Sequence, residues 1–235
     1  MDTPLRNLLE YLQDMGYEDL YVEQRHGGEA APVVASPGGP AEAVSVPRDP
    51  TQRRASLDTV AARAAGCTLC RLSEGRRAVV FGSGNPDADL MFIGEGPGAE
   101  EDRQGLPFVG PAGQLLTKII KAIDLERDQV YICNVVKCRP PGNRDPQPDE
   151  VAACRPYLEA QIRLVAPKLI VALGRVAAQT LLGTEESLGR MRGVWHEVLG
   201  VPVRVTYHPA ALLRQASYKR PTWEDMQIVR ARLRQ

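Results

Sequence analysis

Several features are scarce in this sequence, and each scarcity argues against a class of protein. No apolar run in the 235 residues approaches the roughly 18 that a membrane-spanning helix requires. Five cysteines are too few and too unevenly spaced for a secreted disulfide scaffold, so we interpret them as reduced thiols or metal ligands. The N-terminal segment is acidic and amphipathic, unlike a secretory signal peptide. We therefore expect a cytoplasmic protein.

Acidic and basic side chains balance at 29 each, but they are distributed unevenly along the chain. Residues 1–60 carry five basic and ten acidic side chains, whereas residues 187–235 carry nine basic and three acidic ones. The basic C-terminal segment is where we expect an anionic partner to bind. A solvated helix face explains the same charges equally well, so composition alone leaves both interpretations open.

The sequence divides into three parts. Leucines at helical spacing predict a short amphipathic helix within residues 1–26, which has nothing of its own to pack on. Residues 27–50 contain 14 Gly, Ala or Pro in 24 positions, a composition that predicts a flexible linker. A second helix is predicted at about residues 57–65, and we assign one main domain to residues 55–235.

Within this domain, strand and helix patterns alternate. Four short apolar runs bounded by turn residues predict buried strands, at residues 89–94, 130–134, 168–174 and 203–208. Helical patterns lie between them, at residues 114–123, 149–165 and 175–182. Strands that alternate with helices imply crossover connections and a parallel sheet covered on both faces. The sequence therefore predicts an α/β fold.

The positions at the carboxyl ends of the predicted strands are glycine or polar. In open parallel sheets, ligands bind beyond these ends. The residues found there are Gly94, Glu95, Gly96, Asn134, Gly174 and His208. We therefore predict a single binding site at this edge of the sheet.

Four of the five cysteines form a pattern typical of metal ligands. Cys67 and Cys70 form a C-x2-C pair, in which a turn lets two thiolates converge. Cys138 and Cys154 flank a loop rich in Pro and Asp, which needs a cross-link to be ordered, although they could also be ordinary buried thiols. Four thiols can hold zinc or an iron–sulfur cluster, and their spacing does not decide between the two. Cys133 lies in an apolar run and is predicted to be a core residue.

The glycine-rich segment at residues 94–116 differs from a dinucleotide-binding loop. Glycines after a strand let the backbone approach a flat ligand and present N–H groups to it. Pro97 and the acidic run at 100–102 follow, however, and the acidic run would repel a pyrophosphate. Phe108 stands in this loop, where its ring would be exposed unless it stacks on something. A phosphate-binding loop is therefore disfavoured.

Three motifs and four cysteines together resemble the uracil-DNA glycosylases, in particular the iron–sulfur class called family 4. The motifs are GEGPGAEEDRQGLPFVG at 94–110, NVVKCRPPGNR at 134–144 and YHPAALLR at 207–214. The resemblance covers about residues 60–235. It implies a three-layer α/β/α sandwich with a central four-stranded parallel sheet, and a pocket for one flipped-out uracil. It also implies a 4Fe-4S cluster held by Cys67, Cys70, Cys138 and Cys154.

The resemblance gives roles to three side chains. Phe108 is similar to the ring on which the uracil stacks, and Asn134 to the amide that distinguishes uracil from cytosine. His208 resembles the imidazole that donates to the uracil 2-oxygen, with help from backbone N–H groups near Gly94 to Gly96. Taken alone, a strand-end asparagine can simply satisfy a turn, and a lone histidine is more often structural.

This sequence departs from the wider superfamily at the first motif. The position of the usual water-activating Asp is Gly96, and the position of the aromatic that excludes thymine is Gly98. Glu95 and Glu101 are the nearby carboxylates. We expect Glu101 to position the attacking water, and one of the two to exclude thymine.

The basic end of the domain supplies candidate DNA contacts. A wedge that fills the gap left by a flipped nucleotide is predicted at Leu212, Leu213 and Arg214, although the two leucines also fit the apolar start of a helix. Phosphate contacts are predicted at Arg190, Arg192, Lys219 and Arg220, and a phosphate or sugar contact at Asn143.

The resemblance therefore implies a uracil-DNA glycosylase that acts in base-excision repair of deaminated cytosine. We expect a monomer in a prokaryotic cytoplasm, associated with the nucleoid while it acts on single- or double-stranded DNA, with a structural cluster. A protein partner for the N-terminal helix is left open. The alternative is a non-catalytic iron–sulfur or zinc nucleic-acid-binding module that recognises damaged DNA. A nucleotide hydrolase is disfavoured by the acidic run.

Overall fold

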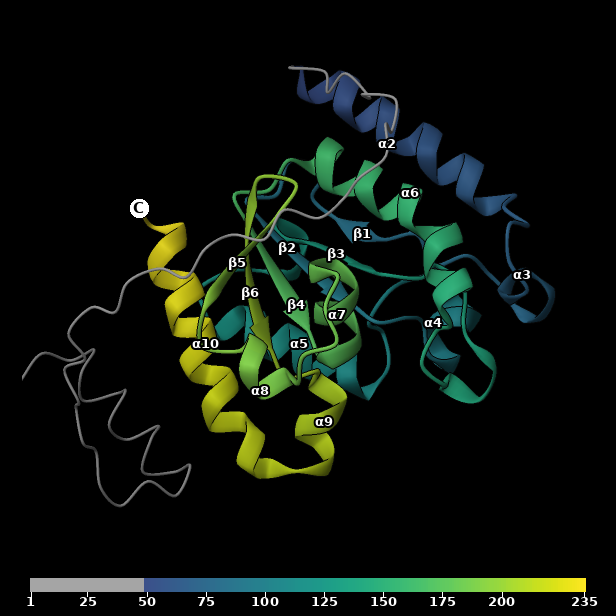
Figure 1. Ribbon diagram of the computed structural model, residues 1–235. Coiled ribbons are helices and arrows are strands. Elements are labelled where there is room, and N and C mark those ends of the chain that lie inside the picture. Colours follow the sequence, from purple (N-terminus) through teal and green to yellow (C-terminus); the bar gives the residue numbers. More distant parts are fainter. Residues whose placement is uncertain (1–48) are drawn as a thin grey trace, which may run out of the picture. The chain divides into compact units, whose positions relative to one another are not determined.

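The computed structural model describes residues 49–235 (Figure 1). The predicted helix within residues 1–26 and the predicted linker up to residue 48 lie outside the described residues. The first element, α2 (Pro50–Ala65), begins earlier than the predicted residue 57. Asp49 caps it by accepting a hydrogen bond from the Thr51 N–H at 2.9 Å, and proline is tolerated in the first helical turn. Within the described part of the chain, no helix is long and apolar enough to cross a membrane.

The described residues form a six-stranded sheet in the order β1-β3-β2-β4-β6-β5. Its four inner strands are parallel and match the four predicted strands: β2 (Leu90–Gly94), β3 (Tyr131–Asn134), β4 (Leu169–Leu173) and β6 (Val201–Thr206). The expected four-stranded parallel sheet is therefore wrong in its extent. Two edge strands, β1 (Ser83–Gly84) and β5 (Trp195–Val198), pair antiparallel to it.

Both edge strands lack the signals on which the prediction relied. Strand β1 has only two residues, too few to show a pattern. Strand β5 is mostly half-buried, and a two-residue turn joins it to β6. Both turn residues, Leu199 and Gly200, have positive φ angles of 52° and 79°. Such turns are usually signalled by Asn-Gly or Asp-Gly, and a leucine in this conformation gives no sequence signal.

Helices flank the sheet on both faces, as predicted. Met91 and Ile93 of β2 belong to a core with α2, α6 (Pro148–Val165) and α7 (Arg175–Leu182). The alternate residues, Leu90 and Phe92, belong to a second core with α5 (Pro111–Ala122) and α10 (Lys219–Leu233). Figure 1 shows α2 and α6 side by side. Because the inner strands are buried on both faces, they appear in the sequence as continuous apolar runs.

Short elements complete the described chain. They are α3 (Leu72–Gly75), α4 (Ala99–Gln104), η1 (Arg127–Gln129), η2 (Pro141–Asn143), α8 (Leu188–Met191), α9 (Pro209–Arg214) and η3 (Ala216–Tyr218). The carboxyl ends of the inner strands meet at one edge of the sheet. Gly94 of β2 lies opposite Asn134 of β3, and Gly174 donates its N–H to the Thr206 oxygen at 2.9 Å.

Candidate functional site

Asn134 ends β3 with a polar atom that has no partner. Its side chain is 2% exposed, and Oδ1 is buried without a hydrogen bond. A buried amide oxygen that is left unpaired costs about 1–3 kcal/mol, so it marks a place where a ligand donor fits. Gly94 keeps this place open: a Cβ on Gly94 would lie 2.5 Å from Asn134 Oδ1 and 2.5 Å from Phe108 Cζ. Asn134 Oδ1 and the Phe108 ring are therefore neighbours.

Phe108 is buried rather than exposed, at 6% of its surface. Its backbone has a positive φ of 52°, which is unfavourable for a phenylalanine and so must be imposed by its surroundings. Gly113 makes room for this backbone conformation, because a Cβ there would lie 1.9 Å from the Phe108 backbone oxygen. The Phe108 ring centroid lies 5.6 Å from that of His208, at an interplanar angle of 33°. Phe108 thus lies close to both side chains that are expected to read and release a base.

Two charged side chains fix the loop at residues 105–110, here called the Phe108 loop. Glu101 Oε1 accepts hydrogen bonds from the N–H groups of Val109 and Gly110, at 2.9 and 3.0 Å. Arg127 donates from Nη2 to the Pro107 oxygen at 2.6 Å. Glu101 was predicted to position water, a role that no observation tests. In the structure it holds the loop that carries the aromatic ring.

His208 follows β6 and caps the start of α9. Its Nδ1 accepts a hydrogen bond from the Ala210 N–H at 3.1 Å. The ring is half-buried, and burial together with the Arg214 charge lowers its pKa to about 4. The imidazole is therefore neutral near pH 7, and because Nδ1 is an acceptor, the ring proton is on Nε2. Gly174 makes room for this ring, since a Cβ there would lie 2.9 Å from His208 Cβ.

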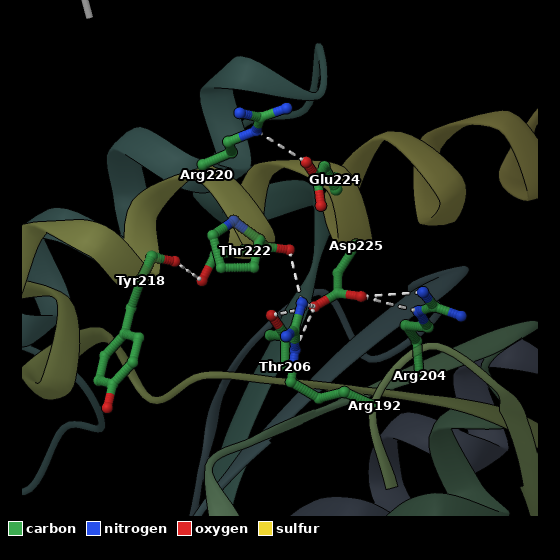
Figure 2. Close-up of polar contacts among 9 residues, drawn as sticks. Arg192, Arg204, Thr206, Tyr218, Arg220, Thr222, Glu224 and Asp225 are labelled. Carbon is green, nitrogen blue, oxygen red and sulfur yellow. Dashed lines mark hydrogen bonds and ion pairs between the residues drawn. The ribbon is translucent and has the colours of Figure 1, made fainter. Parts of the chain in front are cut away.

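A buried ion-pair network anchors the strand that leads to His208 (Figure 2). Asp225 of α10 is 1% exposed and accepts hydrogen bonds from Arg192, Arg204 and Thr206, at 2.7 to 3.2 Å. Arg192 also lies over the Tyr207 ring, 4.5 Å from its centroid. The network joins α10 to the end of β6, directly before the catalytic candidate.

Glu95 follows β2 and has an unusual carboxyl group. Burial and the charge of Asp145 raise its pKa to about 7, against the opposing charge of Arg175. It is half-buried at the same edge of the sheet as Gly94. A carboxyl group that titrates near neutral pH can both accept and donate a proton there. Glu95 therefore has the chemistry that proton transfer requires.

The four predicted ligand cysteines line one cavity, together with Arg76, Lys137 and Tyr157. Two of the sulfur atoms accept hydrogen bonds, Cys138 Sγ from Arg76 Nη1 at 3.4 Å and Cys154 Sγ from the Lys137 N–H at 3.3 Å. In the described residues, no three His, Cys, Asp or Glu side chains form a site for a single metal ion. An all-sulfur donor set around one cavity, with donors directed at sulfur, fits an iron–sulfur cluster. Cys133 is fully buried in β3, as predicted.

The loop between Cys138 and Cys154 has a clip of its own. Arg144 donates two hydrogen bonds to Glu150, at 2.8 and 2.6 Å, and the Glu150 side chain is fully buried. Hydrogen bonding to Arg144 is the main reason that the Glu150 pKa lies below its usual value. This ion pair joins the loop to the start of α6, so it supplies part of the cross-linking that we expected the loop to need. Asn143 is exposed in this loop and accepts from Arg139 Nε at 2.7 Å.

The predicted wedge divides into buried and exposed residues. Leu212 is 4% exposed and Leu213 is 54% exposed, while Arg214 is also exposed. Leu212 cannot enter a duplex without leaving the protein core, so we restrict the wedge to Leu213 and Arg214. Leu212 instead fits the alternative interpretation, in which the leucines form the apolar face at the start of a helix.

The predicted phosphate contacts divide in the same way. Arg190 and Lys219 are exposed, and Arg220 pairs with Glu224 at 3.1 Å on the surface of α10. Arg192 is only 16% exposed and is bound to Asp225. We therefore no longer assign Arg192 to DNA. Part of the positive charge of the C-terminal segment is thus neutralised by ion pairs with Asp225 inside the protein.

Sequence reasoning missed two side chains that shape the site. Arg127 holds the Phe108 loop from 20 residues away, a contact that no local pattern indicates. Lys137 is 1% exposed beside both the cysteines and Asn134. The sequence signal for Lys137 was its position directly after Val135 and Val136, where a charged residue is unusual.

Comparisons with known proteins agree with this geometry. The profile of the Uracil DNA glycosylase superfamily matches residues 81–227. Fold and site together define a protein of that superfamily. A type-4 uracil-DNA glycosylase of Thermotoga maritima is 46% identical over 179 residues, covering 74% of this chain and 93% of that protein. One of Sulfurisphaera tokodaii is 45% identical over 184 residues, covering 74% and 84%. This chain belongs to the type-4 uracil-DNA glycosylase family.

Proposed function

We propose that this protein flips uracil out of DNA and hydrolyses its N-glycosidic bond, releasing free uracil and leaving an abasic site. The reaction begins base-excision repair of deaminated cytosine. The observation that carries this proposal is the buried, unpaired Oδ1 of Asn134 beside the Phe108 ring, whose centroid lies 5.6 Å from that of the His208 ring.

Asn134 supplies selectivity. Its Oδ1 accepts the N3–H of uracil, while its amide N–H donates to the 4-oxygen. Cytosine presents an acceptor and a donor in the opposite places, so it leaves buried polar groups unpaired on both sides. Phe108 contributes stacking, which favours any flat base and therefore adds affinity without selectivity.

His208 eases the departure of the base. Cleavage develops positive charge on the sugar and negative charge on uracil. A neutral imidazole that donates from Nε2 to the 2-oxygen is worth most when that charge has formed, so it lowers the barrier rather than only tightening binding. The Nδ1 contact with Ala210 holds the ring in the tautomer that this role requires.

Glu95 and Glu101 divide the remaining work. We propose that Glu101 keeps the Phe108 loop in place through its two backbone contacts. Glu95, with a pKa of about 7, accepts a proton from the attacking water once it is ionised.

We further propose that the four cysteines hold a 4Fe-4S cluster. When bound, it supplies a cross-link between the C-x2-C turn and the segments around Cys138 and Cys154. We therefore propose a structural role for the cluster. Cys138 is only four residues after Asn134, so a cluster bound at Cys138 would also help to fix the segment that follows Asn134.

The test is release of free uracil from a uracil-containing oligonucleotide by the purified, folded protein, without added metal or cofactor. We expect uracil and an alkali-sensitive abasic site, and no release from a matched cytosine oligonucleotide. Binding of the uracil oligonucleotide without release by folded, brown protein would instead support the non-catalytic binding module.

A further inference from the structure

Lys137 carries a charge that the protein interior does not normally tolerate. Its side chain is 1% exposed, and no other lysine of residues 49–235 is buried. Removing an ammonium group from water is costly unless a negative group or several acceptors compensate. Within the described residues, Lys137 has no carboxylate partner.

The contacts of Lys137 point in two directions. Its Nζ donates to the backbone oxygen of Asn134 at 2.5 Å, and its backbone N–H donates to Cys154 Sγ at 3.3 Å. Lys137 also lines the cavity of the four cysteines. One residue thus contacts both the residue that reads the base and the cysteine cavity.

We propose that Lys137 is a positioning residue that couples the cluster to base recognition. Its ammonium is the counter-charge of the thiolate-bound cluster, and the same group fixes the end of β3 so that the Asn134 amide faces the pocket. This inference rests on the proposed 4Fe-4S cluster. It explains why a lysine is buried in an otherwise apolar segment: the cluster carries net negative charge and offsets the cost of burying the ammonium.

Two separable consequences follow. Removing the positive charge disfavours reduction, because the reduced cluster carries one more negative charge; the reduction potential becomes more negative. Removing the donor frees the Asn134 carbonyl and loosens the amide, which weakens binding of uracil itself. A residue that only filled space would produce neither effect.

The experiment compares Lys137→Met, which removes charge and donor, with Lys137→Gln, which removes the charge but keeps a donor. Lys168→Met is the matched control, because Lys168 forms an exposed ion pair with Asp89 at the start of β4. For each holoprotein we would measure iron content and visible spectrum, the midpoint potential of the cluster, and the inhibition constant of free uracil.

We expect both Lys137 variants to shift the potential to more negative values, and Lys137→Met to weaken uracil inhibition about tenfold, with a smaller effect for Lys137→Gln. If Lys137→Met does not fold, the test rests on Lys137→Gln, whose cluster should have a more negative midpoint potential than that of the wild type. Unchanged potential and uracil inhibition in iron-loaded variants would overturn the coupling while leaving the proposed function intact. Absence of iron from the wild-type protein would overturn the cluster assignment and the coupling together, while uracil release would still test the glycosylase activity.

Discussion

Replacing Gly94 by alanine places a methyl group against Asn134 and Phe108, the two side chains of the proposed base pocket. Gly94 is not in the left-handed region, so alanine causes no backbone strain there. The effect comes from space alone: the new Cβ would lie 2.5 Å from Asn134 Oδ1 and 2.5 and 2.8 Å from two atoms of the Phe108 ring. Ordinary contacts to a Cβ are 3.4–4 Å.

The magnitude follows from these distances. Asn134 or Phe108 must retreat by about 1 Å, and a misplacement of that size can lower the rate about 10²-fold. Overpacking costs about 1–3 kcal/mol of folding free energy. In a protein of this size, each 1 kcal/mol lowers Tm by about 2–4 °C. The Gly94→Ala variant is therefore expected to remain folded at 25 °C and to lose most of its activity.

The assay is single-turnover release of uracil, combined with the inhibition constant of free uracil and a thermal unfolding curve. Gly189→Ala is the matched control, because no atom lies within 4 Å of a Cβ at that exposed position. A folded Gly94→Ala variant with near-normal kcat/KM and uracil inhibition would refute the pocket between Asn134 and Phe108.

The remaining predictions concern proton transfer and DNA contacts. The rate of uracil release should rise with pH through about 7 as Glu95 ionises, and Glu95→Gln should flatten this rise in a pH profile. Because the Glu95 pKa is raised in the folded protein, the wild type should also lose stability relative to Glu95→Gln as pH rises from about 4.5 through 7. Unfolding curves at these two pH values measure that loss. Leu213→Ala should lower activity on double-stranded DNA with less than about 1 kcal/mol loss of stability, whereas Leu212→Ala should cost about 2–5 kcal/mol, and equal unfolding curves would contradict this division. Lys219→Ala should reduce the slope of log affinity against log salt by about one, and an unchanged slope in a binding titration would remove Lys219 from the DNA interface.

The parts of the fold that could be predicted are those specified by short-range patterns. The inner strands are buried on both faces, so each is a continuous apolar run whose end is marked by a polar residue or glycine. Asn134 and His208 could be placed at strand ends for this reason, and parallel pairing then brings those ends to one edge. Edge strands β1 and β5 could not be predicted, because a two-residue ladder and a Leu-Gly turn carry no such pattern.

Long-range contacts decided the rest of the site. The sequence placed Glu101 near the pocket, but only the folded loop revealed its two backbone contacts. Helical spacing in α9, which has six residues, could not tell that Leu212 is buried and Leu213 exposed. Likewise, the choice of Asp225 as the partner of Arg192 depends on two segments 33 residues apart.

In the proposed mechanism, Asn134 binds a flipped uracil while His208 stabilises the uracil anion as it leaves. The most direct measurement is the single-turnover rate of uracil release by Asn134→Ala and by His208→Ala, with folding checked by unfolding curves and cluster content by visible absorption. Each substitution is predicted to lower the rate at least about 10²-fold, the scale of one transition-state donor. Near-normal rates in both folded variants would contradict the account.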